Sequence, residues 1–175
     1  MKFVATPLAG AVVVELEPAH DARGFFARTF CRDEFRAAGL PGEFVQTSLS
    51  YNARRGTLRG MHFQAAPQEE PKLVRCGRGA IFDIVVDLRR DSPTHRRWFG
   101  IELSAENRRA LYVPPGFAHG FQTLADDSEV LYAMAVAYVA ELARGVRWND
   151  PAFAIAWPLP NPIVSERDRG FPLVS

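Results

Sequence analysis

Two stretches of this sequence decide its fold: Gly56-Thr-Leu-Arg-Gly-Met-His62-Phe-Gln64 and Pro114-Pro-Gly-Phe-Ala-His119-Gly-Phe121. The first is a strand-like run that contains a histidine, and in strand geometry His62 and Gln64 share one face. In the second, a proline–glycine turn places His119 at the start of the next strand-like run. We therefore predict two strands that carry one histidine each, with a hydrogen-bonded packing role as the alternative for His62.

Similar runs continue on both sides of these stretches. About ten of them lie between turn residues, at 12–16, 24–30, 44–49, 57–63, 72–76, 80–88, 98–103, 110–113, 120–124 and 130–138. Repeated short strands predict an all-β sandwich or barrel, because closure or sheet packing covers the strand edges. The clearest helix candidate is 33–38, which Gly39 would end. The proline-rich segment 149–162 is expected to be irregular and to wrap the end of the barrel.

The composition is that of an ordinary globular chain. With 175 residues and 47% hydrophobic side chains, we expect a single domain over residues 1–175. No apolar run approaches the ~20 residues of a membrane span, and the N-terminus lacks the apolar core of a secretory signal. The net charge of +1 argues against a dominant nucleic-acid-binding surface. Two cysteines are too few for a disulfide framework, which favours a cytoplasmic location.

Lysine is rare in this chain. Of the 21 basic residues, 19 are arginine, and the two lysines are Lys2 and Lys72. Lys72 stands out because a compact ammonium with an adjustable pKa is what arginine does not provide. A histidine base, a lysine beside a developing oxyanion and a tyrosine acid form a set for proton abstraction next to a ketone. Tyr132, among apolar neighbours, is the candidate acid, with an ordinary core aromatic as the alternative.

The two opening stretches resemble the paired motifs of the cupins. The second motif, P-x-G-x-x-H, is matched by Pro114-Pro-Gly-Phe-Ala-His119, whereas Gln64 stands where the first motif has its second histidine. Two histidines and a neutral amide are a poor ligand set for a transition metal, even with Glu69 or Glu70 as a carboxylate. The resemblance implies a cupin-type jelly-roll barrel with a few short helices, and we expect it to bind no metal and no other cofactor.

A second, more specific resemblance extends over almost the whole chain. Its main stretches are Gly24-Phe-Phe26, Phe44-Val-Gln46, Leu58-Arg-Gly-Met-His-Phe-Gln64, Lys72-Leu-Val-Arg75, Val86-Asp-Leu-Arg89, Leu103-Ser-Ala-Glu-Asn107, Pro115-Gly-Phe-Ala-His-Gly-Phe121, Arg144-Gly-Val-Arg-Trp148 and Ser165-Glu-Arg-Asp168. Together they resemble the dTDP-4-dehydrorhamnose 3,5-epimerase family. The resemblance implies an isomerase that inverts C3 and C5 of dTDP-4-dehydro-6-deoxy-D-glucose. Protons would be removed and returned next to the C4 ketone of this nucleotide-linked sugar.

By position, the resemblance assigns four catalytic residues. His62 is implied to be the base, and Asp168 to orient and polarise it. Lys72 is implied to stabilise the enolate at the C4 oxygen. Tyr132 is implied to return a proton on the opposite face of the sugar.

The resemblance also implies which residues bind the substrate. Arg23, Arg59 and His119 would hold the diphosphate and the sugar, and Tyr138 would stack on the nucleotide base. In a straight strand the Arg59 side chain faces away from His62, so a bulge at Gly60 or a curled side chain is required. The full expected set is Arg23, Arg59, Gln46, His119, Tyr138 and Arg167. The implied assembly is a homodimer in which an N-terminal strand pairs with the partner's sheet and Arg23 reaches the neighbouring site.

The binding residues depart from the family pattern more than the catalytic ones do. Thr47 and Ser48 replace an aspartate and an asparagine, Arg28 and Ala143 replace glutamates, and Arg167 replaces a lysine. A C3-only epimerase acting on a related dTDP sugar or another nucleotide-activated sugar is therefore a second hypothesis. A metal-dependent cupin enzyme and a non-catalytic sugar-binding cupin are further alternatives.

Overall fold

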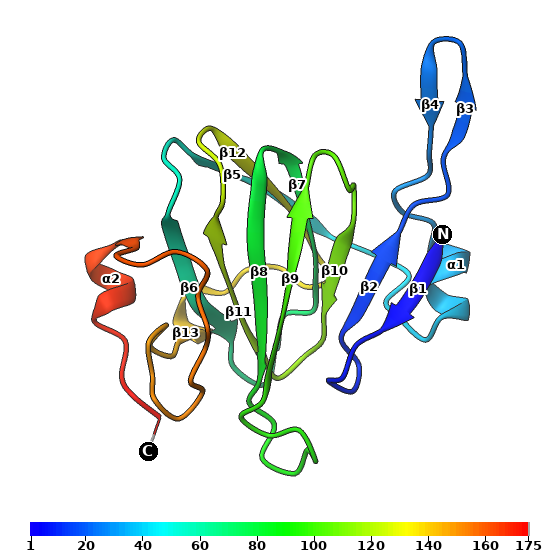
Figure 1. Cartoon of the computed structure of the whole chain (residues 1–175). Coiled ribbons are helices and arrows are strands. Elements are labelled where there is room, and N and C mark those ends of the chain that lie inside the picture. The colour runs from blue at the N-terminus through cyan, green and yellow to red at the C-terminus, as the bar shows by residue number, and fades with distance from the viewer. Residues whose placement is uncertain (175) are drawn as a thin grey trace.

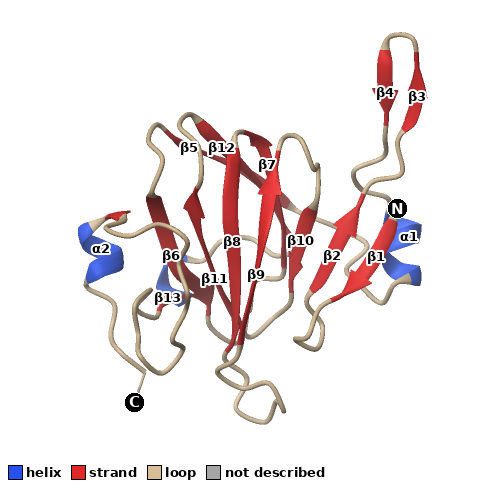
Figure 2. Ribbon diagram, in the orientation of Figure 1, coloured by secondary structure: helices blue, strands red, loops and turns tan. Residues whose placement is uncertain are grey.

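Two six-stranded sheets face each other and form the body of the protein (Figures 1 and 2). The computed structural model describes residues 1–174. The first sheet has the order β1-β2-β10-β7-β12-β5 and is antiparallel. Its strands are β1 (Lys2–Ala5), β2 (Val12–Glu15), β5 (Gln46–Asn52), β7 (Lys72–Arg78), β10 (Ala110–Val113) and β12 (Ser128–Met134).

The second sheet has the order β13-β6-β11-β8-β9, and a short strand, β14, pairs parallel to β6. Its strands are β6 (Thr57–Gln64), β8 (Ala80–Asp87), β9 (Trp98–Ser104), β11 (Phe117–Thr123), β13 (Ala143–Gly145) and β14 (Ile163–Val164). A separate hairpin of β3 (Ala19–Asp21) and β4 (Gly24–Phe26) projects away from both sheets (Figure 1). The helices are short: α1 (Arg32–Ala37), the 3₁₀ turn η1 (Ala140–Leu142) and α2 (Glu166–Arg169). The architecture is the all-β jelly roll that the sequence predicts.

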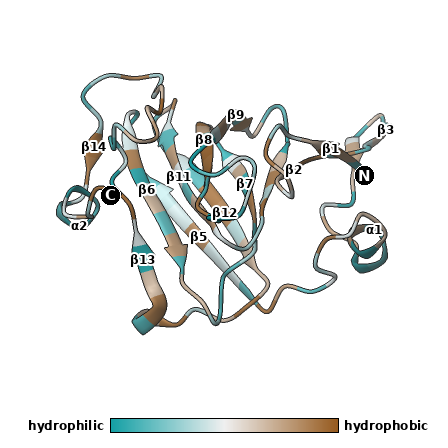
Figure 3. Cartoon of the chain, turned by 90° about the horizontal axis from the view of Figure 1, so that it is seen from below, coloured by the Kyte–Doolittle hydropathy of each residue, from teal (hydrophilic) through white to brown (hydrophobic). Residues whose placement is uncertain are grey.

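Three apolar clusters hold these layers together. The largest fills the space between the sheets, with Val74, Leu111 and Val130 from the first sheet and Val85 and Phe121 from the second. A second cluster lies under the C-terminal segment 146–157, and a third lies between the first sheet and α1. In β6, hydrophobic and hydrophilic residues alternate, as its bands in Figure 3 show, because its two faces meet different surroundings.

The predicted elements are confirmed, with shifted ends. The ten expected runs correspond to ten observed strands, but β1, β3, β13, β14 and α2 were not expected. The expected helix 33–38 is observed one residue earlier, and Gly39 follows it with φ +74°. Residues 149–162 are irregular, as expected, but they cover the outer face of the second sheet rather than the barrel end. The described part of the chain has no helix long and apolar enough to cross a bilayer.

Candidate active site

Strand register places the candidate catalytic side chains on the inner faces of the two sheets. His62 on β6 lies directly opposite His119 on β11, and both share the face of Phe121, which belongs to the core between the sheets. Tyr132 on β12 lies opposite Val74, another core residue, on β7. Because side chains alternate along a strand, Lys72, two residues before Val74, shares this inner face. Residues far apart in the sequence thus converge in the barrel interior.

A pocket of about 200 Å³ opens beside β6 and β13. Its lining residues are His62, Phe63, Gln64, Glu70, Lys72, Tyr138, Ala143, Arg144 and Arg167. Four of the ten site residues expected from the sequence are among them: His62, Lys72, Tyr138 and Arg167. Three fixed cationic side chains in this small volume make the pocket suitable for an anionic ligand.

His62 and Asp168 form a hydrogen-bonded pair at this pocket. The His62 Nε2 atom lies 2.8 Å from Asp168 Oδ1, and the Gly60 N–H donates to the other carboxylate oxygen at 3.0 Å. Ser165 caps α2 by accepting a hydrogen bond from the Asp168 N–H. Burial alone raises the pKa of Asp168, but the hydrogen bonds from His62 and Gly60 outweigh it and leave this pKa below its usual value. An ionised Asp168 therefore holds the imidazole in place through this hydrogen bond.

The β6 backbone bulges next to this pair. His62 lies opposite His119 and Arg59 opposite Phe121, so three steps on β6 match two steps on β11. The extra residue brings Arg59 to the same side as His62, which confirms the expected bulge. Gly60 has φ +142°, and a Cβ there would lie 2.6 Å from the Cα of Gly120. Only glycine fits this position.

Lys72 forms an ion pair with Glu70. Both side chains are about 10% exposed, and both line the pocket with His62. Lys72 opens β7, which fixes its Cα, while Glu70 lies in the connection from β6. The sequence suggested Glu70 only as a possible metal ligand, and the structure instead places it against the lysine.

Tyr132 and His119 lie deeper in the barrel. Their rings are 6.1 Å apart and nearly perpendicular, and His119 Nε2 lies 2.8 Å from Asp83 Oδ1. Burial, with the negative charge of Asp83, raises the pKa of Tyr132 well above its usual value. Tyr132 is therefore protonated at neutral pH and can act as an acid but not as a base. Asp83, whose pKa burial raises, was not expected from the sequence.

Apart from Arg23, the expected binding residues fall into three groups. Tyr138 and Arg167 line the pocket, and Gln46 accepts a hydrogen bond from the Tyr138 N–H at 3.1 Å. Arg59 reaches β5, where its Nε donates to Asn52 Oδ1 at 2.8 Å. His119 is only 4% exposed and lies outside the pocket lining.

Arg23 is not brought to the pocket of its own chain. It lies at the tip of the β3–β4 hairpin, paired with Asp21, and its side chain is 90% exposed. The hairpin stands apart from β6 and α2, at the other side of the molecule (Figure 1).

The residues at the cupin metal position do not form a ligand set. The Gln64 amide donates to the carbonyls of Gln68 and Ala137 and accepts from the Val139 N–H at 2.8 Å. Its donors and its acceptor are thus engaged by the backbone. His119 is bonded to Asp83, and in residues 1–174 no three or more His, Cys, Asp or Glu side chains gather in a way that could hold a metal.

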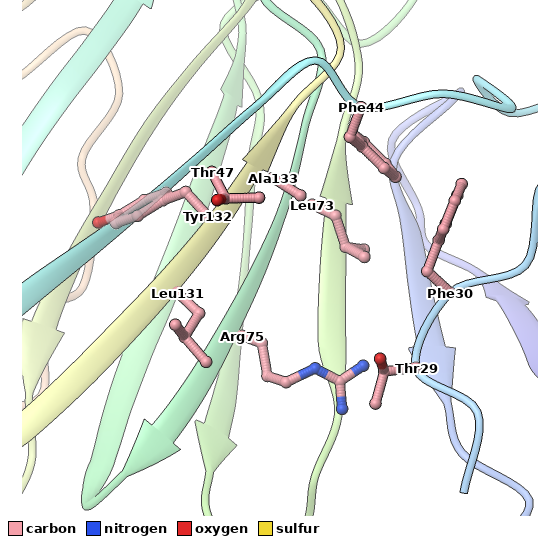
Figure 4. A pocket seen from close by; sticks show the side chains of 9 residues that line it. All are labelled: Thr29, Phe30, Phe44, Thr47, Leu73, Arg75, Leu131, Tyr132 and Ala133. Atoms are coloured by element: carbon pink, nitrogen blue, oxygen red, sulfur yellow. The ribbon is translucent and has the colours of Figure 1, made fainter.

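A larger hollow of about 450 Å³ lies on the outer face of the first sheet. It is lined mostly by apolar side chains, including Phe30, Phe44, Leu73 and Leu131, together with Arg75. Tyr132 also borders it, but its side chain extends away from these residues (Figure 4). The hollow therefore lacks the acid–base groups found in the barrel and is not the candidate site for chemistry.

Comparison with known proteins identifies a close match over the full fold. Residues 5–175 match the family described as dTDP-4-dehydrorhamnose 3,5-epimerase. The enzyme of that name from Pseudomonas aeruginosa is 46% identical, over 94% of this chain and 92% of its own length. That from Methanothermobacter thermautotrophicus is 45% identical, over 97% and 92%. The crystal structure of the Bacillus anthracis enzyme, with TDP and PPi bound, superimposes with a TM-score of 0.96 at 44% identity and covers 99% of both chains.

This chain is similar both to proteins named as 3,5-epimerases and to a protein named as a 3-epimerase. A Legionella pneumophila 3,5-epimerase, solved in complex with dTDP-4-keto-L-rhamnose, has a TM-score of 0.92 at 34% identity and covers 98% of this chain and 92% of its own. A Streptomyces niveus protein named dTDP-4-dehydrorhamnose 3-epimerase is 40% identical, over 93% of this chain and 80% of its own length.

Proposed function

This chain belongs to the dTDP-4-dehydrorhamnose 3,5-epimerase family, and we propose that it inverts C3 and C5 of dTDP-4-dehydro-6-deoxy-D-glucose. As a member of this family it is an isomerase that acts on a nucleotide sugar. The observation that carries the proposal is the His62–Asp168 pair at a cationic pocket, with Lys72 in the same lining.

The proposed reaction begins at His62. Its Nε2 is engaged by Asp168, so Nδ1 is the nitrogen left to take the proton from C3. The C–H electron pair moves into the C3–C4 bond, and the C4 oxygen becomes an enolate. Lys72 stabilises this oxyanion, because a fixed ammonium in a water-poor site interacts strongly with developing negative charge.

Tyr132 completes the proposed inversion from the opposite face. Its hydroxyl gives a proton to C3, the C4 carbonyl re-forms, and the tyrosinate and the imidazolium exchange protons with solvent. The raised pKa of Tyr132 supports this role, because it keeps the proton on oxygen until a strongly basic enolate forms. The same sequence at C5 gives the doubly inverted sugar.

Solvent labelling tests this function. In deuterium oxide, the product of the wild-type enzyme is expected to carry deuterium at C3 and C5, read by NMR, because each new proton comes from solvent. His62→Ala is expected to abolish both exchange and inversion. Inversion without solvent label at either carbon would contradict the proposal.

A C3-only reaction is the second candidate. It is favoured by Ala143, which lines the pocket where the family pattern has a glutamate, and by the similarity to a named 3-epimerase. Deuterium at C3 alone, with C5 configuration retained, would select this alternative.

We further propose a homodimer whose sites are completed by the partner's Arg23. Support comes from the β3–β4 hairpin, where Phe26 is 81% exposed, and from the apolar hollow beside Phe30 and Leu131. A projecting two-stranded hairpin is marginal alone and needs a surface to pack against. Membrane and nucleic-acid partners and any cofactor are not part of the proposal, and a cytoplasmic location remains a prediction.

A further inference from the structure

One carboxylate lies among the charged side chains of the pocket. Of the described side chains that line it, Lys72, Arg144 and Arg167 are cationic, and Glu70 is the single acid. An anionic substrate gains nothing from a nearby carboxylate, because like charges repel. The presence of Glu70 here therefore requires a reason other than attraction of the nucleotide.

Hydrogen bonds to backbone carbonyls on either side of Glu70 hold its segment in place. The Gln64 side chain donates to the Gln68 carbonyl at 2.6 Å, and the Ala135 N–H donates to the Pro71 carbonyl at 2.9 Å. These bonds fix the connection on both sides of Glu70, one to β6 and one to the end of β12. Pro71 also restricts the backbone immediately before Lys72.

The ion-pair partner of Glu70 is the Lys72 ammonium, whose position must be restrained if it is to stabilise the enolate. A lysine ammonium sits on a flexible four-carbon stem and has three donors that rotate freely. In this structure the ammonium is paired with Glu70, and both side chains are largely removed from solvent. The positive charge of Lys72 also acts on the buried Asp83 carboxylate and partly offsets the rise in its pKa that burial causes.

We propose that Glu70 is a positioning residue, which holds the Lys72 ammonium beside the position that the C4 oxygen of the substrate takes. The inference rests on the proposed function and adds a residue to it. Without the carboxylate, the lysine stem is free to turn toward the pocket mouth. A misplaced donor stabilises the enolate poorly, and a displacement of about 1 Å costs on the order of 10²-fold in rate.

The test compares Glu70→Gln with Glu69→Gln, a matched change at the exposed neighbouring glutamate. Epimerisation of dTDP-4-dehydro-6-deoxy-D-glucose, C3 deuterium exchange and dTDP binding by calorimetry are measured for each variant. In Glu70→Gln we expect kcat and the exchange rate to fall together by about 10- to 100-fold. We expect the KM, the dTDP Kd and the Tm to stay near wild type, because Glu70 is proposed to act on the Lys72 ammonium rather than on the nucleotide, and glutamine keeps its shape. Glu69→Gln should match wild type throughout.

A double variant shows whether Glu70 acts through the lysine. In a Lys72→Ala background, Glu70→Gln is expected to cause no further loss of kcat. A full additional loss there, or a wild-type kcat in Glu70→Gln, would overturn the inference. So would a kcat loss that is matched by weaker dTDP binding and a lower Tm. Failure of the wild-type enzyme to turn over the sugar would instead reject the proposed function, since the inference concerns only the ratio of variant to wild type.

Discussion

His62 Nε2 and Asp168 Oδ1 lie 2.8 Å apart, although 106 residues separate them in the sequence. The contact joins β6 to α2, the last helix of the chain, and the second oxygen of Asp168 binds the Gly60 N–H of the bulge. The orientation of the proposed base thus depends on a strand irregularity and on a short capped helix together.

Asp168→Asn is expected to lower kcat by roughly 10²-fold, because a neutral amide lacks the charge that polarises His62 and holds its ring less firmly. The pKa of Asp168 is lowered, so the carboxylate stays ionised as pH falls from neutrality. Its contribution to stability is present above the usual aspartate pKa and is lost as pH falls through the lowered value. Rate profiles and unfolding curves from pH 3 to 8 check both points. An unchanged kcat in this variant would contradict the pairing role.

Tyr132→Phe is expected to separate exchange from inversion. The base and the ammonium remain, so C3 deuterium exchange with retained configuration should persist while epimerisation falls by roughly 10²-fold or more. Because the pKa of Tyr132 is raised, deprotonation of this residue should not reduce the wild-type rate up to about pH 9. NMR of the recovered sugar distinguishes the outcomes, and equal loss of both processes would argue against an acid acting after abstraction.

Much of the fold follows from local sequence, whereas the pairing inside the barrel does not. Alternating apolar residues and turn residues located ten strands, because each strand buries one face. The contact of His119 with Asp83 depends on how β11 and β8 align, and a single sequence does not specify that register. Glu70 lies only two residues from Lys72, but the sequence suggests it only as a possible metal ligand, because a single sequence does not show which side chains meet in the pocket. No sequence motif around Asp83 indicates that it pairs with His119.

Chelation is expected to leave the activity unchanged. Three backbone groups engage the Gln64 amide and Asp83 engages His119, which leaves the cupin metal position without a ligand set. The rate would be measured after prolonged dialysis against a strong chelator, with metal content determined in parallel. Loss of turnover that one added divalent ion restores would contradict this prediction and revive the metal-dependent cupin hypothesis.

Gly60→Ala is expected to destabilise the protein by about 3 kcal/mol and to remove most of the activity. The added Cβ would lie 2.6 Å from the Gly120 backbone, and φ +142° is strained for alanine. Denaturant unfolding gives the loss of stability. Gly39→Ala serves as a control, since its φ is also positive but a Cβ there meets no atom within 4 Å. Equal effects at both positions would show that strain alone, rather than contact with β11, matters at Gly60.

Complementation between two inactive variants tests the proposed homodimer. Arg23 lies on the projecting hairpin and His62 lies in the pocket, so a site that uses both would take Arg23 from the partner. Arg23→Ala and His62→Ala should each be nearly inactive as pure dimers. After the two are unfolded and refolded together in equal amounts, half of the dimers are mixed, and each mixed dimer has one intact site. We therefore expect about a quarter of the wild-type activity to return. Recovery should be absent when the two dimers are mixed without subunit exchange, which is the control. A wild-type protein that is monomeric by light scattering and fully active would rule out a shared site. An Arg23→Ala variant with normal turnover would do the same.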